Sequence, residues 1–226
     1  MLKRYIRNTN ALTEDECNQL HSKCVCVVGC GGLGGYVVEE LARIGVLNIT
    51  VIDCDVFEES NLNRQAFSTT ENLGKSKVDV TKERVTLINP DVKLNAIKDR
   101  LTRANAKDLV SNHDLVIDCL DNFKDRFWLA NACKEMPIIY GAIAGWYGQV
   151  STIFPGDVSF VDIYGSMEDG TDQKETEGNL VFTAATVASI QAAEAVKVLL
   201  GHKDVLRNKI LMVDMRTSSF EVMELS

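Results

Sequence analysis

Residues 24–34 read Cys24-Val-Cys-Val-Val-Gly-Cys-Gly-Gly-Leu-Gly34, and this stretch says more about the chain than any other. Its valines predict a short apolar strand, and Gly29, Gly31 and Gly34 have the spacing G-x-G-x-x-G. A helix is expected directly afterwards, over 36–44. Glycines so placed let backbone N–H groups approach a phosphate-bearing ligand, and the helix start adds its positive dipole end. The stretch therefore predicts a nucleotide-binding unit.

An acidic residue follows the next expected strand. This apolar strand, over 49–52, ends in Asp53, about 20 residues after the glycines, where a carboxylate is suited to ribose hydroxyls. The same arrangement also describes NAD-dependent dehydrogenases, so these residues alone leave the nucleotide open.

Composition limits the class of protein. The 226 residues are 46% hydrophobic, enough for a sizeable core, and we expect a single domain over 1–226. A net charge of -8 disfavours a general nucleic-acid role. We find no apolar run of bilayer length and no signal peptide, so a cytoplasmic protein without a membrane partner is expected.

The seven cysteines are scattered and odd in number, as expected for reduced thiols in the cytoplasm. No C-x-x-C pair occurs. Cys24 and Cys26 fall on a predicted buried strand, so they are interpreted as core thiols rather than metal ligands.

Strands and helices alternate as far as Tyr140. This alternation predicts an α/β, Rossmann-like fold with a mostly parallel sheet and helices on both faces. A capping box at Thr13 and Glu16 opens the first helix. The expected helices cover 13–21, 36–44, 75–88, 104–110 and 123–135, and the expected strands cover 25–28, 49–52, 92–97, 115–119 and 136–140.

The pattern changes at Gly148, and antiparallel strands are expected to continue the sheet. Segments 149–154 and 158–163 flank a Pro-Gly-Asp turn, which predicts a hairpin. A polar surface loop is expected over 164–178. A helix over 180–200 is apolar on nearly all sides, which favours burial in the domain or an interface. Two strands, 209–214 and 219–225, close the chain.

Two polar segments follow the second strand. Arg64 carries a fork of donors suited to phosphate oxygens, and its place soon after Asp53 favours a functional role over an ordinary exposed loop. Lys75 and Lys77 open a helix, where their charge has the wrong sign for the helix dipole. An anion nearby would explain them, although a solvated position stays open for Lys75.

A third polar segment, Asp118-Cys-Leu-Asp-Asn-Phe-Lys-Asp-Arg126, follows a buried strand. Asp118 and Asp121 are candidates to hold a hard cation such as Mg²⁺. The alternative is that Asp121 or Asn122 caps the next helix, and both roles are compatible. By composition alone, Arg4 and Arg7 belong to a solvated terminal tail.

Taken together, these motifs resemble the ThiF/MoeB/HesA family, relatives of the ubiquitin-activating enzymes. The resemblance runs from Arg4 to the C-terminus, and S-N-L-x-R-Q combined with D-x-x-D-N is far more specific than the glycines. The matching segments are Arg4-Tyr-x-Arg7, Gly29-x-Gly-Gly-Leu-Gly34, Asp53-x-Asp55, Ser60-Asn-Leu-x-Arg-Gln65, Gly74-x-x-Lys77, Asn89-Pro90, Asp118-x-x-Asp-Asn122, Arg126, Gly148-Gln149 and Gln191-Ala-x-Glu-Ala195.

The resemblance implies an enzyme that uses ATP and Mg²⁺ to adenylate the C-terminal glycine carboxylate of a ubiquitin-fold protein, releasing pyrophosphate. It implies that Asp53 holds the ribose, that Lys77 neutralises the α-phosphate and that Asp121 binds magnesium. It also implies a homodimer in which Arg7 reaches the partner's ATP site. The catalytic residues implied are Arg7, Arg64, Lys77 and Asp121, and the nucleotide-binding residues are Gly29, Gly31, Gly32, Gly34, Asp53, Asp55, Asn61, Arg64, Gln65, Lys77, Asp121 and Asn122.

Two departures from the family are informative. Many members hold a structural zinc with two C-x-x-C pairs, and since this chain has none, no zinc is expected. Members that form a covalent intermediate use a cysteine in the loop before the long helix, but 172–178 contains no cysteine. We therefore expect adenylation without a covalent cysteine intermediate, and we interpret Cys119 and Cys133 as structural.

The leading hypothesis is an adenylyltransferase acting on a sulfur-carrier protein ending in Gly-Gly, as in thiamine or molybdopterin pathways. Activation of a tRNA-linked or peptide carboxylate is an alternative, and the acidic charge argues against tRNA. A non-catalytic scaffold would be expected to lose ATP-site residues, which this chain keeps. An NAD-dependent oxidoreductase is disfavoured because Arg64 and Lys77 would have no role in hydride transfer. The sequence does not identify the carrier.

Overall fold

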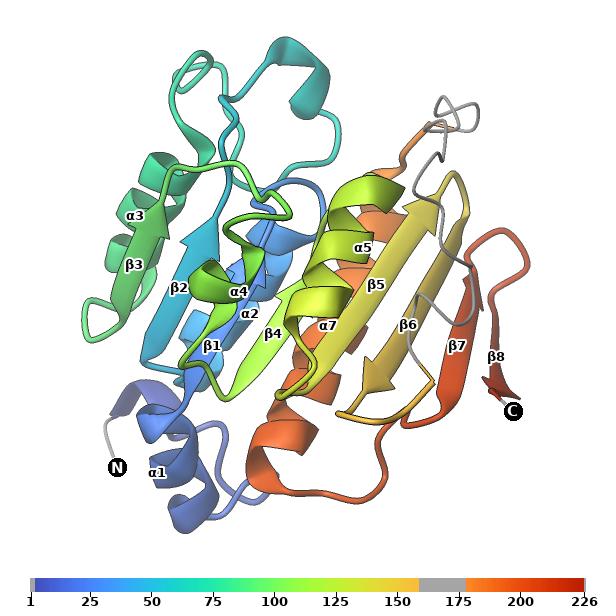
Figure 1. Ribbon diagram of the computed structural model, residues 1–226. Helices are drawn as coiled ribbons and strands as arrows, with labels where there is room; N and C mark the ends of the chain where they lie inside the picture. The colour runs from blue at the N-terminus through green and yellow to red at the C-terminus, as the bar shows by residue number, and fades with distance from the viewer. Residues whose placement is uncertain (1–2, 159–177, 226) are drawn as a thin grey trace.

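The computed structural model describes residues 3–158 and 178–225 as a single eight-stranded sheet with helices around it (Figure 1). The strand order is β3-β2-β1-β4-β5-β6-β7-β8. The strands are β1 (Cys24–Val28), β2 (Asn48–Ile52), β3 (Lys93–Ile97), β4 (Leu115–Asp118), β5 (Ile138–Ala144), β6 (Tyr147–Ile153), β7 (Lys209–Asp214) and β8 (Ser219–Glu224). The helices are α1 (Glu14–Ser22), α2 (Gly34–Ile44), α3 (Lys77–Ile88), α4 (Ala106–Val110), α5 (Phe123–Ala132) and α7 (Val181–Leu200), with 3₁₀ turns η1 (Lys3–Tyr5) and η2 (Glu59–Asn61).

The first five strands are parallel, as the alternating elements predict. Strand β1 lies at the centre, with β2 on one side and β4 on the other. The strand order therefore reverses between β1 and β4. In open α/β sheets a ligand binds at such a reversal, beyond the carboxyl ends of the strands.

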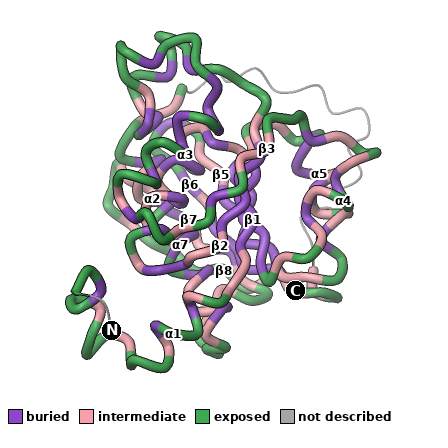
Figure 2. Tube along the Cα trace, turned by 90° about the vertical axis from the view of Figure 1, so that its left-hand side faces the viewer, coloured by how far each residue is buried: buried purple, intermediate pink, exposed green. Residues whose placement is uncertain are grey.

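Side chains of β1 alternate between two hydrophobic cores, one on each face of the sheet. Val25 and Val27 pack with α2 and α7, whereas Cys26 and Val28 pack with α4 and α5. Figure 1 shows α4 and α5 in front of the sheet and α2 and α7 behind it. In Figure 2 the buried residues follow the central strands, and the outer sides of the helices are exposed. The predicted α/β class with two covered faces is confirmed.

The C-terminal strands are antiparallel, but the predicted hairpin has the wrong partner. Strand β6 pairs with β5 along its whole length and with β7 on its other side. The turn that forms this hairpin is at Gly145, with φ of 55°, and not at the Pro155-Gly-Asp157 turn. Residues 159–163 of the predicted hairpin and 164–177 of the predicted loop lie outside the described residues.

Helix ends differ from the predicted ones by a few residues. Helix α3 begins at Lys77 rather than 75, α4 begins at Ala106 rather than 104, and α5 ends at Ala132 rather than 135.

Helix α7 corrects one expectation about the chain. By length and composition it is apolar enough to cross a bilayer, so the statement that no apolar run reaches that length is wrong. Half of this stretch is buried inside the structure, however, against β5, β6 and α2. The buried face carries Gln191 and Glu194, both hydrogen-bonded within the core. Packing and polar partners of this kind are features of a core helix.

Candidate nucleotide site

A cavity of about 620 Å³ opens at the carboxyl ends of the parallel strands, where the strand order reverses. Its volume lies within the range of small-molecule sites. Ten of the predicted nucleotide-binding residues line it: Gly29, Gly31, Gly32, Asp53, Asp55, Arg64, Gln65, Lys77, Asp121 and Asn122. Loops separated by up to about ninety positions thus meet at one site.

The glycine loop packs so closely that two of its glycines have no room for a side chain. Gly29 has a φ of 97°, and a Cβ there would lie 2.6 Å from the Cys119 carbonyl oxygen. A Cβ on Gly34 would lie 1.8 Å from the Gly29 carbonyl oxygen. Gly34 therefore does not line the cavity, and its role is to let α2 start directly against the loop.

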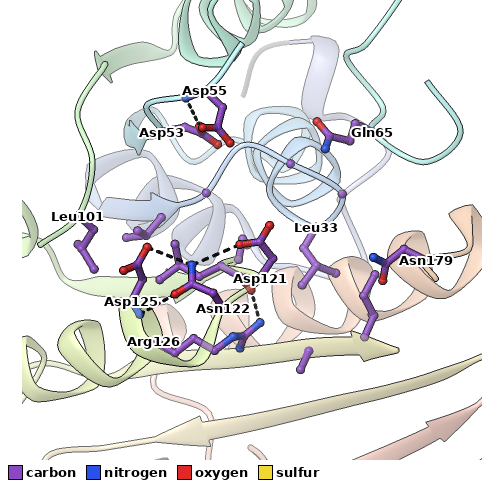
Figure 3. Close-up of a pocket in the computed structure, with 18 of the residues that line it drawn as sticks. Leu33, Asp53, Asp55, Gln65, Leu101, Asp121, Asn122, Asp125, Arg126 and Asn179 are labelled. Carbon is purple, nitrogen blue, oxygen red and sulfur yellow. Dashed lines mark hydrogen bonds between the residues drawn. The ribbon is translucent and has the colours of Figure 1, made fainter. Parts of the chain in front are cut away.

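The Asp53 carboxylate joins the glycine loop to the end of β2. Its Oδ2 accepts from the backbone N–H of Cys30 at 2.7 Å. Its Oδ1 accepts from the backbone N–H of Asp55 at 2.8 Å (Figure 3). Burial raises the pKa of Asp53, and the nearby Lys77 charge opposes that effect. Asp53 thus fixes the shape of the loop as well as facing the cavity.

Lys77 is a buried cation at the first residue of α3. It is only 7% exposed, and its Nζ lies 3.1 Å from Oδ2 of Asp55. Burial alone would raise the pKa of Asp55, but the hydrogen bond and charge of Lys77 outweigh it, so that pKa is lowered. Lys75 is exposed and does not line the cavity, which agrees with the solvated alternative.

The segment after η2 contributes Arg64 and Gln65 but not Asn61. Arg64 lies beside Gly32 and donates from Nη1 to Ser60 O at 3.1 Å. Gln65 lies against Gly31, and its buried Oε1 has no partner among the described residues. Asn61 points elsewhere: its Oδ1 accepts from the Glu58 backbone N–H at 3.0 Å, and it is absent from the cavity lining. Its placement does not fit the predicted contact with the nucleotide.

After β4, Asp118 and Asp121 have different surroundings. Asp118 is 3% exposed and both its oxygens are engaged, one by the Leu120 N–H and the other by Arg126 at 3.2 Å. The suggestion that Asp118 holds a cation is therefore wrong, because a buried arginine already neutralises it. Asp121 faces the cavity, and Asn122 caps α5 by accepting from the Asp125 N–H at 2.8 Å.

The donor set around Asp121 suits a hard cation. Asp125, one turn into α5, is 6% exposed, and its Oδ1 has no partner among the described residues. Mg²⁺ in nucleotide sites takes one or two carboxylates together with phosphate oxygens. Asp53, Cys54 and Asp55 also bring three potential ligand atoms within 4.8 Å of one another, but the backbone and Lys77 already engage both carboxylates.

Cys54 and Cys119 line the cavity, whereas Cys133 follows the end of α5 and does not line it, and the three differ in exposure. Burial raises the pKa of Cys133 to about 12 and that of Cys119 well above its ordinary value. Thiols of this kind are poor nucleophiles, in agreement with a structural role. Cys54 is exposed and lines the cavity, which the sequence motifs did not indicate. Burial and the neighbouring carboxylates raise its pKa as well.

Several cavity residues were not predicted. Arg100 and Leu101 come directly after β3, and the rule that ligands bind at carboxyl ends of strands would have indicated them. Asn179 and Tyr147 lie outside the matching motifs, which gave no signal for them. Gln149 belongs to the matching segment Gly148-Gln149, but no role was predicted for it. Arg7 is exposed and outside the cavity lining. Figure 1 shows the N-terminal segment at the opposite end of the sheet.

Known proteins resemble this chain in sequence and in fold. The ThiF family model matches residues 3–226. The molybdopterin-synthase adenylyltransferase of Escherichia coli is 32% identical over 205 residues, covering 89% of this chain and 82% of that protein. The SAMP-activating enzyme E1 of Haloferax volcanii is 35% identical over 207 residues, covering 90% and 77%.

Other relatives are longer. A probable molybdopterin-synthase adenylyltransferase of Porphyra purpurea is 34% identical over 209 residues, covering 90% of this chain, and the chain spans only 55% of its length. Among solved structures, E. coli MccB with MccA-N7isoASN aligns with a TM-score of 0.86 at 20% identity, covering 99% of this chain and 72% of that one. At this identity the likeness shows a shared fold.

Proposed function

This chain belongs to the ThiF family, and we propose that it is an ATP-dependent adenylyltransferase that activates the C-terminal carboxylate of a ubiquitin-fold sulfur-carrier protein. The observation that carries the proposal is that Arg64, Lys77 and Asp121 converge on one cavity beside the glycine loop. The names of the relatives support the reaction, since they are adenylyltransferases of molybdopterin synthase and of sulfur carriers.

In this reaction the carrier carboxylate attacks the α-phosphorus of ATP. A carboxylate oxygen–phosphorus bond forms, the bond from the α-phosphorus to the bridging oxygen breaks, and pyrophosphate leaves. Such a transfer needs positioning and neutralisation of negative charge more than a proton-transfer group. Lys77 and Arg64 supply positive charge at fixed positions, because Asp55 holds the first and the Ser60 carbonyl the second.

Magnesium is part of the proposal. Asp121 would hold it, and the cation would neutralise charge on the phosphates. Asp53 would take the ribose, since it stands at the end of β2 beside the glycine loop.

Homodimerisation is proposed from the position of Arg7. It is exposed and does not line the cavity of its own chain, so it can serve an ATP site only if that site belongs to a second copy. A monomer in sedimentation at micromolar concentration would contradict this part of the proposal.

The substrate is proposed to be a carrier ending in Gly-Gly in a thiamine- or molybdopterin-type pathway, in the cytoplasm. Adenylation is proposed to proceed without a covalent cysteine intermediate, which the high pKa values of Cys119 and Cys133 support. A reducible enzyme–carrier adduct trapped by mass spectrometry would contradict that step.

The experiment is ATP–pyrophosphate exchange with a purified ubiquitin-fold carrier protein ending in Gly-Gly. Replacing Lys77 by Ala is expected to slow exchange about 10²–10³-fold, because one preorganised charge is lost from the transition state. Lys75→Ala is the matched control, since Lys75 is exposed, lies two positions away and does not line the cavity. Equal rates for the two variants would refute the role of Lys77, and no exchange in the wild type would refute the function.

A further inference from the structure

Asp125 lines the cavity but belongs to none of the family motifs that place residues there. It lies in the first turn of α5 and is 94% buried, being only 6% exposed. An ionised carboxylate at such a depth is costly unless donors or cations compensate it. The neighbouring Arg126 does not compensate the charge of Asp125, because it is paired with Asp118 and the Leu120 carbonyl.

The carboxylate of Asp125 is connected to that of Asp121 by a single amide. Nδ2 of Asn122 donates to Asp125 Oδ2 at 3.0 Å and to Asp121 Oδ1 at 3.4 Å (Figure 3). Oδ1 of Asn122 accepts from the Asp125 backbone N–H at 2.8 Å. The nitrogen and the oxygen of the Asn122 amide therefore both have partners. Exchanging their positions by a rotation of the amide would break all three hydrogen bonds.

The second oxygen of the Asp125 carboxylate is buried without a partner. Asp125 Oδ1 has no hydrogen-bond partner, and no cation pairs with Asp125, among the described residues. Two carboxylates joined through one neutral amide repel each other, and a cation bound at Asp121 would relieve that repulsion. Asp125 is thus placed to orient a metal ligand, Asp121, without contacting the metal itself. Its negative charge also increases the attraction of the site for a cation.

We propose that Asp125 is a positioning residue for the divalent cation of this enzyme: it fixes the Asn122 amide, which in turn orients the Asp121 carboxylate. The inference rests on the proposed function, because it presupposes a cation bound together with nucleotide at Asp121. It assigns Asp125 no contact with the reacting atoms. Its effect is on the affinity for the cation.

The test measures Mn²⁺ binding by electron paramagnetic resonance in the presence of the α,β-methylene analogue of ATP. Asp125→Asn keeps an acceptor for the Asn122 amide but loses the charge, and Asp125→Ala loses both. Outer-shell changes cost about 10–100-fold in metal affinity, so Asp125→Asn is expected near the lower value and Asp125→Ala near the upper. The affinity for the metal-free analogue, measured by calorimetry, is expected to stay at the wild-type value.

Asp108→Asn is the matched control, since it removes one exposed carboxylate from the neighbouring helix α4 and does not line the cavity. It is expected to bind Mn²⁺ like the wild type. If both Asp125 variants bind Mn²⁺ as tightly as Asp108→Asn, the positioning role is overturned while the proposed function stands. Failure of the wild type to bind the analogue at all would instead count against the proposed function. A weakened affinity for the metal-free analogue, equal to the loss for Mn²⁺, would show a merely structural role.

Discussion

The parallel and antiparallel parts of the sheet differ in how deeply the arginine of an ion pair is buried. At the carboxyl ends of the parallel strands, charged side chains are buried: Lys77, Asp118, Asp125 and Arg126 are each less than 9% exposed. In the antiparallel part Arg207, which pairs with Asp157, is 53% exposed, although the Asp157 side chain itself is only 6% exposed. There the last strand, β8, leaves apolar side chains such as Phe220 exposed.

Buried and exposed charged residues differ in what they cost the fold and in what they contribute to it. A buried charge costs free energy, so a cluster of them in one cavity indicates that the site needs an environment of low dielectric, where charges act strongly on a ligand. A surface pair costs little and contributes little. Buried charges gather beside the cavity, but burial alone does not mark the site, since Glu194 of α7 is also buried and accepts from Thr152 of β6. The antiparallel strands complete the sheet and one wall of the cavity.

The largest effect is expected from Arg126→Met. Arg126 pairs with the buried Asp118 and lies over the ring of Tyr140, with 5.0 Å from its guanidinium carbon to the ring centroid. Its removal leaves Asp118 buried without a cation, which is expected to lower the free energy of unfolding by about 3–5 kcal/mol. Urea denaturation followed by circular dichroism measures this change.

The matched control is Arg207→Met, which removes the exposed arginine of the antiparallel part. Arg207 is 53% exposed, and the Phe154 N–H still donates to Asp157 when Arg207 is replaced, so the unfolding midpoint is expected to change far less than in Arg126→Met. Similar losses in the two variants would contradict the comparison, since they would mean that depth of burial does not decide what these pairs contribute.

The sequence predicts the parallel part better than the antiparallel part, and the reason is the range of the contacts. In the parallel part the strand, glycine turn and helix are neighbours in sequence, so local patterns predict them together with the residues at strand ends. The partner of β6 could not be predicted, because the Pro155-Gly-Asp157 turn signal is stronger than the turn at Gly145 that forms the hairpin. Likewise, no pattern in the sequence around Asp118 indicates that Arg126, rather than a metal ion, neutralises this carboxylate.

A second prediction concerns the residue that connects the two parts. Gln191 of α7 is fully buried and donates from Nε2 to the Asp118 carbonyl at 2.8 Å. It packs against Gly141, where a Cβ would lie 2.3 Å from its Cδ. Gln191→Ala is expected to cost about 2–4 kcal/mol in the free energy of unfolding, from a cavity and an unpaired buried carbonyl.

Ser189→Ala is the control for Gln191, because Ser189 is exposed on the same helix. Its unfolding midpoint in urea is expected to stay close to that of the wild type. If Gln191→Ala unfolds at the same urea concentration as Ser189→Ala, α7 is not fixed to the parallel strands through this side chain.

The smallest expected effect is a dependence on pH at the Arg207–Asp157 pair. Burial by itself raises the pKa of Asp157, but the Arg207 hydrogen bond and the Phe154 N–H outweigh it, so this pKa is lowered on folding. A carboxylate with a lowered folded-state pKa stabilises the protein above its unfolded pKa of about 3.9, and this stabilisation is lost as the pH falls through the folded value. The melting temperatures of wild type and Asp157→Asn are therefore expected to differ at pH 7 and to converge in acid. If the difference between the two melting temperatures does not change with pH, the Asp157 charge contributes nothing to stability. The Arg207–Asp157 contact would then be held by the geometry of the turn alone.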